Sequence, residues 1–174
     1  MRFLPLITLL AACSTIPDTE EGKKEQATFA KAKVAEFKAA DPAIAKLFDS
    51  AYAYAIFPAI KKGGVCLGGA FGRGGVIEKG LWIGYSDMTQ ATVGFQLGGQ
   101  SFSEVIFFED KAAFDKFIEG EFEFAATVSA VAADKGAAAK ANYEKGMLVF
   151  IHADKGLMYE ATVGGQKFRY KTKN

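Results

Sequence analysis

Glycines placed inside short apolar segments are the feature that most constrains the fold of this 174-residue chain. They follow an apolar run at residues 55–60, which ends at the sequence KKGG over 61–64. The pieces with strand composition are residues 65–71, 75–79, 81–85, 89–97 and 102–108. Glycine inside a strand marks a bulge, sharp coiling or a close backbone approach, as at the corners of barrels. We therefore expect a strongly curved, glycine-rich, mainly antiparallel and barrel-like sheet.

Two helices are predicted before this sheet and one after it. Apolar residues recur at helical spacing over residues 27–37. A second helix is predicted to begin with Asp41 as its N-cap and Pro42 as its first residue, followed by an apolar stripe over 44–51. The pattern at 110–118 predicts a third, shorter helix. The expected fold class is α+β, with N-terminal amphipathic helices and one further short helix.

The C-terminal third adds further candidate strands. Residues 121–133 alternate with period two, although their alanines also permit a helix. Residues 147–153 and 157–163 flank the turn sequence at 154–156, which predicts a hairpin. Residues 168–170 are expected to close the sheet.

The N-terminus has the features of an export signal. Residues 1–12 contain a basic start, a short apolar run and small residues, and the run is shorter than the about 20 residues that span a bilayer. The sequence LAAC at residues 10–13 resembles a bacterial lipobox, in which Cys13 would be the acylated first residue of the mature chain. The alternatives are a truncated start or a plain secretory signal with an incidental cysteine.

The predicted acylation determines the expected location and domain limits. Several acyl chains anchor a protein stably, at about 0.8 kcal/mol per buried methylene. Ser14 follows the cysteine where an aspartate would indicate retention in the inner membrane, which favours the outer membrane, with the protein facing the periplasm or the cell surface. We expect residues 13–27 to form a polar tether and residues 28–174 to form one globular domain, present as a monomer.

The polar side chains argue against an enzyme. The chain has one histidine, His152, and two cysteines, of which Cys66 lies in an apolar run typical of a buried residue. Glu104 and Glu109 would lie on opposite faces of one strand, so they are not expected to pair as acid and base. The glycine block lacks the spacing of a phosphate-binding loop. We therefore predict no catalytic residue, no metal site and no cofactor.

The net charge of +1 gives no reason to expect nucleic-acid binding, yet it hides opposed local blocks. Basic residues gather around the glycine block with one acid among them, and the basic residues are Lys61, Lys62, Arg73 and Lys79. The last ten residues contain four basic side chains and no acid, whereas residues 101–124 are strongly acidic. Basic side chains near an anionic membrane contribute about 1 kcal/mol each. The same charges are equally consistent with an ordinary solvated surface.

Three sequence blocks carry a resemblance to a known family. They are AYAIFPAIKKGGVCLGGAFGRGGV, GLWIGYS and TVGFQLGGQSFSEVIFF. Together they resemble the SYLF domain family, which includes bacterial lipoproteins and eukaryotic modules linked to phosphoinositides and actin patches. The resemblance runs from about residue 29 to the C-terminus. It implies a curved β-rich body with an amphipathic helical part that binds membrane phospholipid without catalysis or cofactor.

The resemblance also indicates which basic residues contact lipid. Lys61 and Lys62 follow the AIFP block at basic positions of the family, and the local charge adds Arg73 and Lys79 as candidates. The proline that eukaryotic members often place after their tryptophan motif is missing after Trp82, and actin binding, a property of that branch, is not expected.

The sequence thus predicts a lipoprotein whose domain binds anionic phospholipid with phosphoinositide-like head groups. Two alternatives remain open. One is a structural envelope lipoprotein that contacts a protein partner. The other is a carrier of an apolar ligand, which the 16 phenylalanines and the curved sheet would suit.

Overall fold

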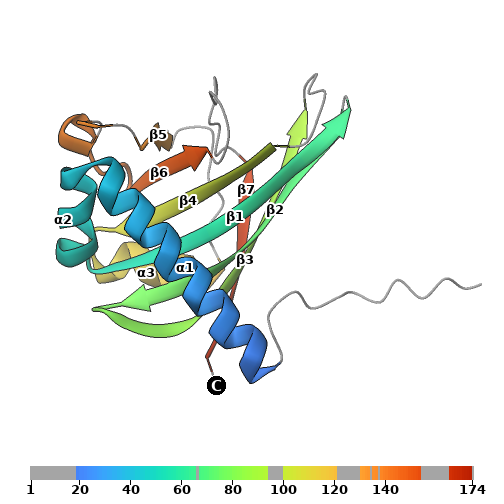
Figure 1. Cartoon of the computed structure of the whole chain (residues 1–174), viewed down its shortest axis with the longest axis horizontal. Helices are drawn as coiled ribbons and strands as arrows, with labels where there is room; N and C mark the ends of the chain where they lie inside the picture. The colour runs from blue at the N-terminus through green and yellow to red at the C-terminus, as the bar shows by residue number, and fades with distance from the viewer. Residues whose placement is uncertain are drawn as a thin grey trace, which may run out of the picture.

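A computed structural model describes residues 19–65, 67–93, 100–120, 130–133, 135–136, 138–153 and 165–173. The helices are α1 (Glu20–Ala40), α2 (Pro42–Ser50), α3 (Lys111–Ile118) and the short 3-10 helix η1 (Ala138–Lys140). The strands are β1 (Ala53–Val65), β2 (Leu67–Glu78), β3 (Leu81–Val93), β4 (Gln100–Phe108), β5 (Ala130–Ala132), β6 (Met147–Ala153) and β7 (Gln166–Thr172). They form one sheet of order β5-β6-β4-β1-β2-β3-β7, and α1 crosses one of its faces diagonally (Figure 1).

The predicted α+β class is confirmed. Every neighbouring pair of strands is antiparallel except β5 and β6, which are parallel. The sheet is not closed within the described residues, because β5 and β7 are its two edges. Residues 168–170 lie in β7, which extends the sheet beside β3 as an edge strand and does not close a barrel. No helix in the described part of the chain is long and apolar enough to cross a membrane.

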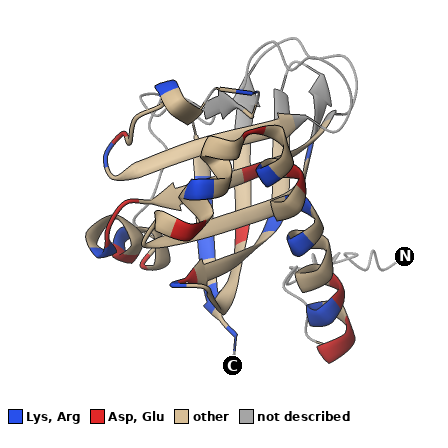
Figure 2. Ribbon diagram, turned by 60° about the vertical axis from the view of Figure 1, so that its left-hand side comes forward, with Lys and Arg blue, Asp and Glu red and all other residues tan. Residues whose placement is uncertain are grey.

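Helix α1 begins earlier than the sequence predicts. Thr19 caps it by accepting a hydrogen bond from the Gly22 amide over 3.1 Å, and acidic residues occupy its first turn. The expected tether over residues 13–27 is therefore wrong from Glu20 onward, where the chain is helical. The error has a physical reason, because residues 20–26 at the start of α1, EEGKKEQ, include no apolar side chain that would reveal a helical stripe. Figure 2 shows acidic and basic residues interspersed along it.

The other two predicted α-helices are confirmed, and α2 begins at its predicted cap. The Asp41 carboxylate accepts from the Ala43 amide over 2.9 Å and starts α2. Its second oxygen accepts from the Ala138 amide over 3.0 Å, which ties η1 to the junction of α1 and α2. Asp110 accepts from the Ala113 amide over 2.8 Å and starts α3. These caps depend on neighbouring residues, so the sequence predicts them well.

The strand boundaries differ from the prediction where a glycine lies inside a strand, because the sequence pattern predicts a strand end at such a glycine. Strand β1 runs through KKGG to Val65, so the predicted strand at 65–71 spans two strands and is wrong. The predicted strands at 75–79 and 81–85 are parts of the longer strands β2 and β3. Residues 94–97, 121–129, 154–156 and 157–163, on which further predictions fell, lie outside the described residues.

Glycines lie inside these long strands at positions where the ring of a neighbouring strand packs directly against the backbone. A Cβ atom on Gly75 would overlap the ring of Trp82 in β3. A Cβ atom on Gly74 would meet the Phe57 ring at 2.7 Å. Contacts under about 3 Å between such carbons are repulsive, so only glycine fits without rearrangement. The glycines therefore permit close packing inside a curved sheet.

The sheet has an apolar core on each face. The inner face, which packs against α3, buries Phe57, Met88 and Phe168 among others. The outer face, which packs against α1 and α2, buries Phe37, Ile44 and Phe107 among others, while the N-terminal half of α1 buries only Ala30. This uneven coverage leaves part of the outer face open beside α1.

Candidate functional site

A groove of about 880 Å³ lies between the N-terminal half of α1 and the outer face of β1 and β2. Its wall on the helix side includes Gly22 and Ala32, and its floor includes Ala59. None of these residues carries a side chain beyond Cβ. Their small size leaves space between the helix and the sheet.

Aromatic side chains make the groove apolar. Phe29 of α1 is 46% exposed and Phe71 of β2 is 39% exposed, and both line the groove together with Pro58. Large aromatic residues usually bury most of their surface in a single chain. Two of them exposed along one groove form an apolar surface to which a ligand can bind.

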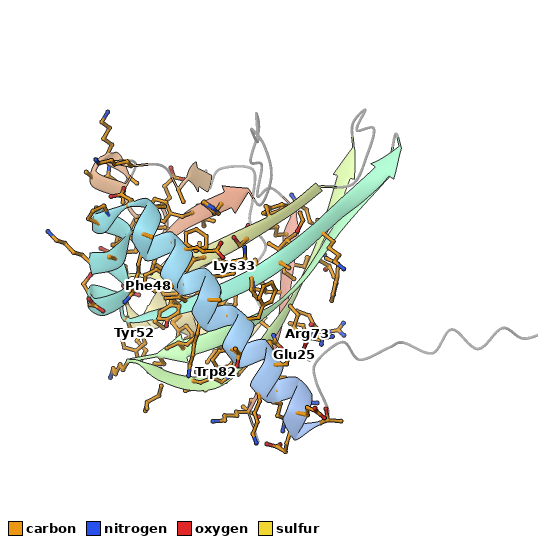
Figure 3. The ribbon with its side chains drawn as sticks, in the orientation of Figure 1. Glu25, Lys33, Phe48, Tyr52, Arg73 and Trp82 are labelled. Atoms are coloured by element: carbon orange, nitrogen blue, oxygen red, sulfur yellow. The ribbon has the colours of Figure 1, made fainter. Side chains whose placement is uncertain are left out.

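Two cations and one carboxylate accompany this apolar lining. Lys61 of β1 and Arg73 of β2 line the groove from the sheet, and Glu25 lines it from α1. Figure 3 shows Glu25 and Arg73 near each other. Lys61 lies directly opposite Phe71 in the register of β1 and β2. The Arg73 Nε atom is 3.7 Å from the Asp87 Oδ1 atom of β3, which is too long for a hydrogen bond. Arg73 therefore lines the groove while it forms an ion pair, without a hydrogen bond, with Asp87.

A buried amide adds polar atoms with no partner. Both polar atoms of the Gln26 side chain are buried, and neither finds a hydrogen-bond partner within the described residues. Leaving such a group unsatisfied costs about 1–3 kcal/mol. Gln26 lines the groove, so its amide would meet a polar ligand or water there if the side chain turned toward the groove.

The structure brings together two of the predicted lipid-contact residues. Lys61 and Arg73 line the same groove. The backbone of Lys62 pairs with Ala70, and its side chain lies outside the described part of the structure. Lys79 is not among the groove residues: it occupies the turn between β2 and β3, with Nζ 5.1 Å from the centre of the Tyr52 ring. The predicted acylation site, Cys13, lies outside the described residues.

Sequence reasoning missed the contribution of α1 to this site. Gln26 fell within the predicted tether, and Phe29 lay off the predicted apolar stripe at positions 27, 30, 34 and 37. An aromatic residue outside the buried stripe of an amphipathic helix is a usable signal, because such a residue has to be exposed or meet a partner.

A fully buried carboxylate, that of Glu104, lies on the inner face and not in the groove. Glu104 of β4 is fully buried, and its Oε2 atom accepts a hydrogen bond from Gln166 Nε2 over 3.0 Å. Burial raises its pKa to about 7, against the smaller opposite effect of the Gln166 hydrogen bond. Glu109 is exposed at the end of β4, so the two do not form an acid–base pair.

Neither the histidine nor the acidic side chains of the described residues form a catalytic or metal-binding group. The His152 ring packs edge-on against Phe37, with ring centres 6.0 Å apart. The described residues hold no group of three or more His, Cys, Asp or Glu side chains placed to bind a metal ion.

Comparison with known proteins identifies the family. Residues 89–173 match the family model Ysc84, described as "Las17-binding protein actin regulator". The chain contains a SYLF domain. Beta cell expansion factor A of Aeromonas veronii is 34% identical over 128 residues, which cover 73% of this chain and 49% of that protein. The chain therefore spans about half the length of this relative. The matched part of the SYLF domain begins within β3, so Lys61 and Arg73 precede it.

Proposed function

We propose that this SYLF domain binds anionic phospholipid in the groove between α1 and the strands β1 and β2. The observation that carries the proposal is the pairing of two cations, Lys61 and Arg73, with two exposed aromatic residues, Phe29 and Phe71, in one groove. A phospholipid offers the complementary pair of a charged phosphate and an apolar chain.

The two kinds of contact have different roles in this proposal. The Lys61 ammonium is a point charge, and the Arg73 guanidinium offers a planar set of donors to phosphate oxygens. Phe29 and Phe71 cover the apolar part of the lipid, and burial of apolar surface contributes about 25 cal/mol per Å². Glu25 repels a phosphate that enters too far along the helix, which would direct the head group toward the sheet side of the groove.

The protein acts in this proposal as a non-catalytic, membrane-anchored module. Its residues 1–12 direct export, and acylated Cys13 inserts into the outer membrane. The groove is lined from α1, whose N-cap is Thr19, six residues after Cys13 in the sequence. An anchored domain meets head groups at a high local concentration, so weak contacts suffice for binding.

Vesicle co-sedimentation tests the proposal. The non-acylated chain, residues 14–174, is mixed with vesicles of phosphatidylcholine alone or with added phosphatidylglycerol or phosphoinositide. We expect binding only to the anionic vesicles, and we expect the double variant Lys61→Glu, Arg73→Gln to lose about tenfold or more in affinity. The matched control is Lys116→Glu, Lys135→Gln, which makes the same change in net charge at exposed sites elsewhere.

The outcomes separate the alternatives. Equal sedimentation of the groove variant and its control would contradict the assignment of the groove. If the wild-type chain ignores both kinds of vesicle, phospholipid binding fails as the function, and a protein partner in the envelope becomes the better explanation.

A further inference from the structure

The outer face of the sheet continues beyond the groove, across β2, β3 and β7. In the strand register, Arg73 of β2 lies opposite Asp87 of β3, and Asp87 lies opposite Arg169 of β7. Neighbouring strands are about 4.8 Å apart, so the backbones that carry the two arginines are about 10 Å apart. Asp87 lies between them as a single acid.

A second row of paired residues runs parallel to the first. Across β1, β2, β3 and β7 in turn, this row consists of Lys61, Phe71, Thr89 and Lys167, each opposite the next. Lys171 lies two residues after Arg169 in β7, and it is opposite Tyr85 of β3. Alternate residues of a strand share a face, so these rows lie side by side on one surface.

Burial shows that this surface faces outward. In β7, Gln166 and Phe168 are buried and Tyr170 is half-buried, whereas the alternate residues Lys167, Arg169 and Lys171 are exposed. Buried and exposed side chains alternate along β7, as is typical of an antiparallel strand with one face in solvent. The ribbon that leads to the C-terminus shows this basic character (Figure 2).

The strands of this surface carry more cations than acids, and acids of α1 border it: Glu25 lines the groove, and Glu20 interacts electrostatically with Lys173, just beyond β7. The three cations of β7, here named the β7 strip (Lys167, Arg169 and Lys171), add to Lys61 and Arg73, and Asp87 is the acid that the register places among them. Asp87 is already 3.7 Å from Arg73. The surface is thus basic over three strands and joins the groove through Phe71.

We infer that the β7 strip docks the domain on the surface of an anionic bilayer, beside the groove, so that the groove opens onto the head groups. This inference rests on the proposed function and adds the surface that orients the domain. A bilayer fits better than an acidic protein, because the cations are spread over a broad face whose border carries the exposed rings of Phe29 and Phe71. Cations beside exposed aromatic residues are typical of binding at the head-group boundary.

Each cation held near an anionic membrane contributes roughly fivefold in affinity, and this contribution is screened by salt. Replacing the charges of the strip therefore reduces affinity without altering the groove. The strip lies on an edge strand, so its exposed side chains tolerate substitution, while the buried residues Gln166 and Phe168 of the same strand remain unchanged.

The experiment compares four non-acylated chains on phosphatidylcholine vesicles with and without phosphatidylglycerol, at low and high salt. They are wild type, the strip variant Arg169→Glu, Lys171→Glu, its matched control Lys116→Glu, Lys135→Glu, and the groove variant Lys61→Glu, Arg73→Gln. We expect the strip variant to lose about tenfold or more in affinity at low salt and to lose most of the salt dependence of its binding, while the control binds as wild type.

Circular dichroism checks that each variant is folded. If the reversed charges unfold the edge strand, the neutral variant Arg169→Gln, Lys171→Gln takes the place of the strip variant.

The results distinguish failure of this inference from failure of the proposed function. If the groove variant loses binding and the strip variant does not, the strip is not a docking surface and the groove remains. If wild type does not bind anionic vesicles, both fail. Free glycerol phosphate should not displace the domain, because one small anion reaches only one row of cations. Displacement by it, or equal binding to soluble polyglutamate, would show that the strip does not select a bilayer.

Discussion

Gln166 of β7 donates through Nε2 to the Oε2 atom of Glu104 in β4 over 3.0 Å, although β1, β2 and β3 lie between these strands in the sheet. Such a contact is possible only if the sheet curls until its C-terminal edge faces its middle. Phe57 of β1 and Phe168 of β7 show the same curvature, with ring centres 5.5 Å apart. The hydrogen bond therefore joins two distant strands across the inner face.

The buried carboxyl makes stability depend on pH. Glu104 has a pKa of about 7 in the folded protein, above the ordinary value of 4.5. Its stabilising contribution is then fully present below about pH 4.5 and is lost as pH rises through about 7. A shift of this size corresponds to about 3 kcal/mol between these limits. Urea unfolding at a series of pH values measures the effect.

The variant Glu104→Gln isolates this group. Its amide stays neutral and can still bond to Gln166, so we expect it to unfold at higher urea concentration than wild type above pH 7 and to depend less on pH. Glu109→Gln is the control, because Glu109 is an exposed carboxyl at the end of the same strand. Parallel pH profiles for wild type and Glu104→Gln would show that Glu104 ionises normally.

Glycine in β2 is expected to be required for packing. Gly75→Ala places a methyl group against the Trp82 ring, and overpacking of this kind costs about 1–3 kcal/mol. Gly69→Ala is the matched control in the same strand, since its nearest neighbour would be a backbone oxygen at 3.5 Å. Thermal unfolding compares the two. If both variants lose equal stability, the cause is strand flexibility and not the tryptophan.

The Asp41 carboxylate is expected to stabilise more than one element. Asp41→Ala removes the acceptor for both Ala43 and Ala138 and should cost about 2 kcal/mol, near the upper end for a helix cap. Asp110→Ala, which removes only the cap of α3, should cost about 1 kcal/mol. Chemical denaturation of both variants gives the comparison, and equal losses would show that the bond to η1 contributes nothing.

The exposed aromatic residues should affect lipid binding and not folding. Phe29→Ala and Phe71→Ala are each expected to weaken binding to anionic vesicles about tenfold by loss of apolar contact, at low and high salt alike. Leu81→Ala is the control, because Leu81 is 70% exposed in the strand β3 but does not line the groove. If the loss of affinity disappears at high salt, the rings act only by positioning the charged side chains and not by apolar contact with the lipid.

The starts of α2 and α3 could be predicted because each depends on residues close in the chain, whereas the polar first turns of α1 hid its start at Thr19. Asp41 and Asp110 cap helices through amides two and three residues away. The strand ends could not be predicted in the same way, because glycine is common both in turns and at crowded positions in strands. Only the partner strand distinguishes these uses, as Trp82 does for Gly75.

The sequence by itself determined the starts of α2 and α3, the curved and glycine-rich character of the sheet and the resemblance to the SYLF family, since each is carried by local pattern. Only the tertiary structure decided that Phe29 shares a groove with Phe71 and Arg73, and that Glu104 is buried against Gln166. These residues come from elements far apart in the chain. Their meeting depends on strand register and on the curvature of the whole sheet, which no local pattern specifies.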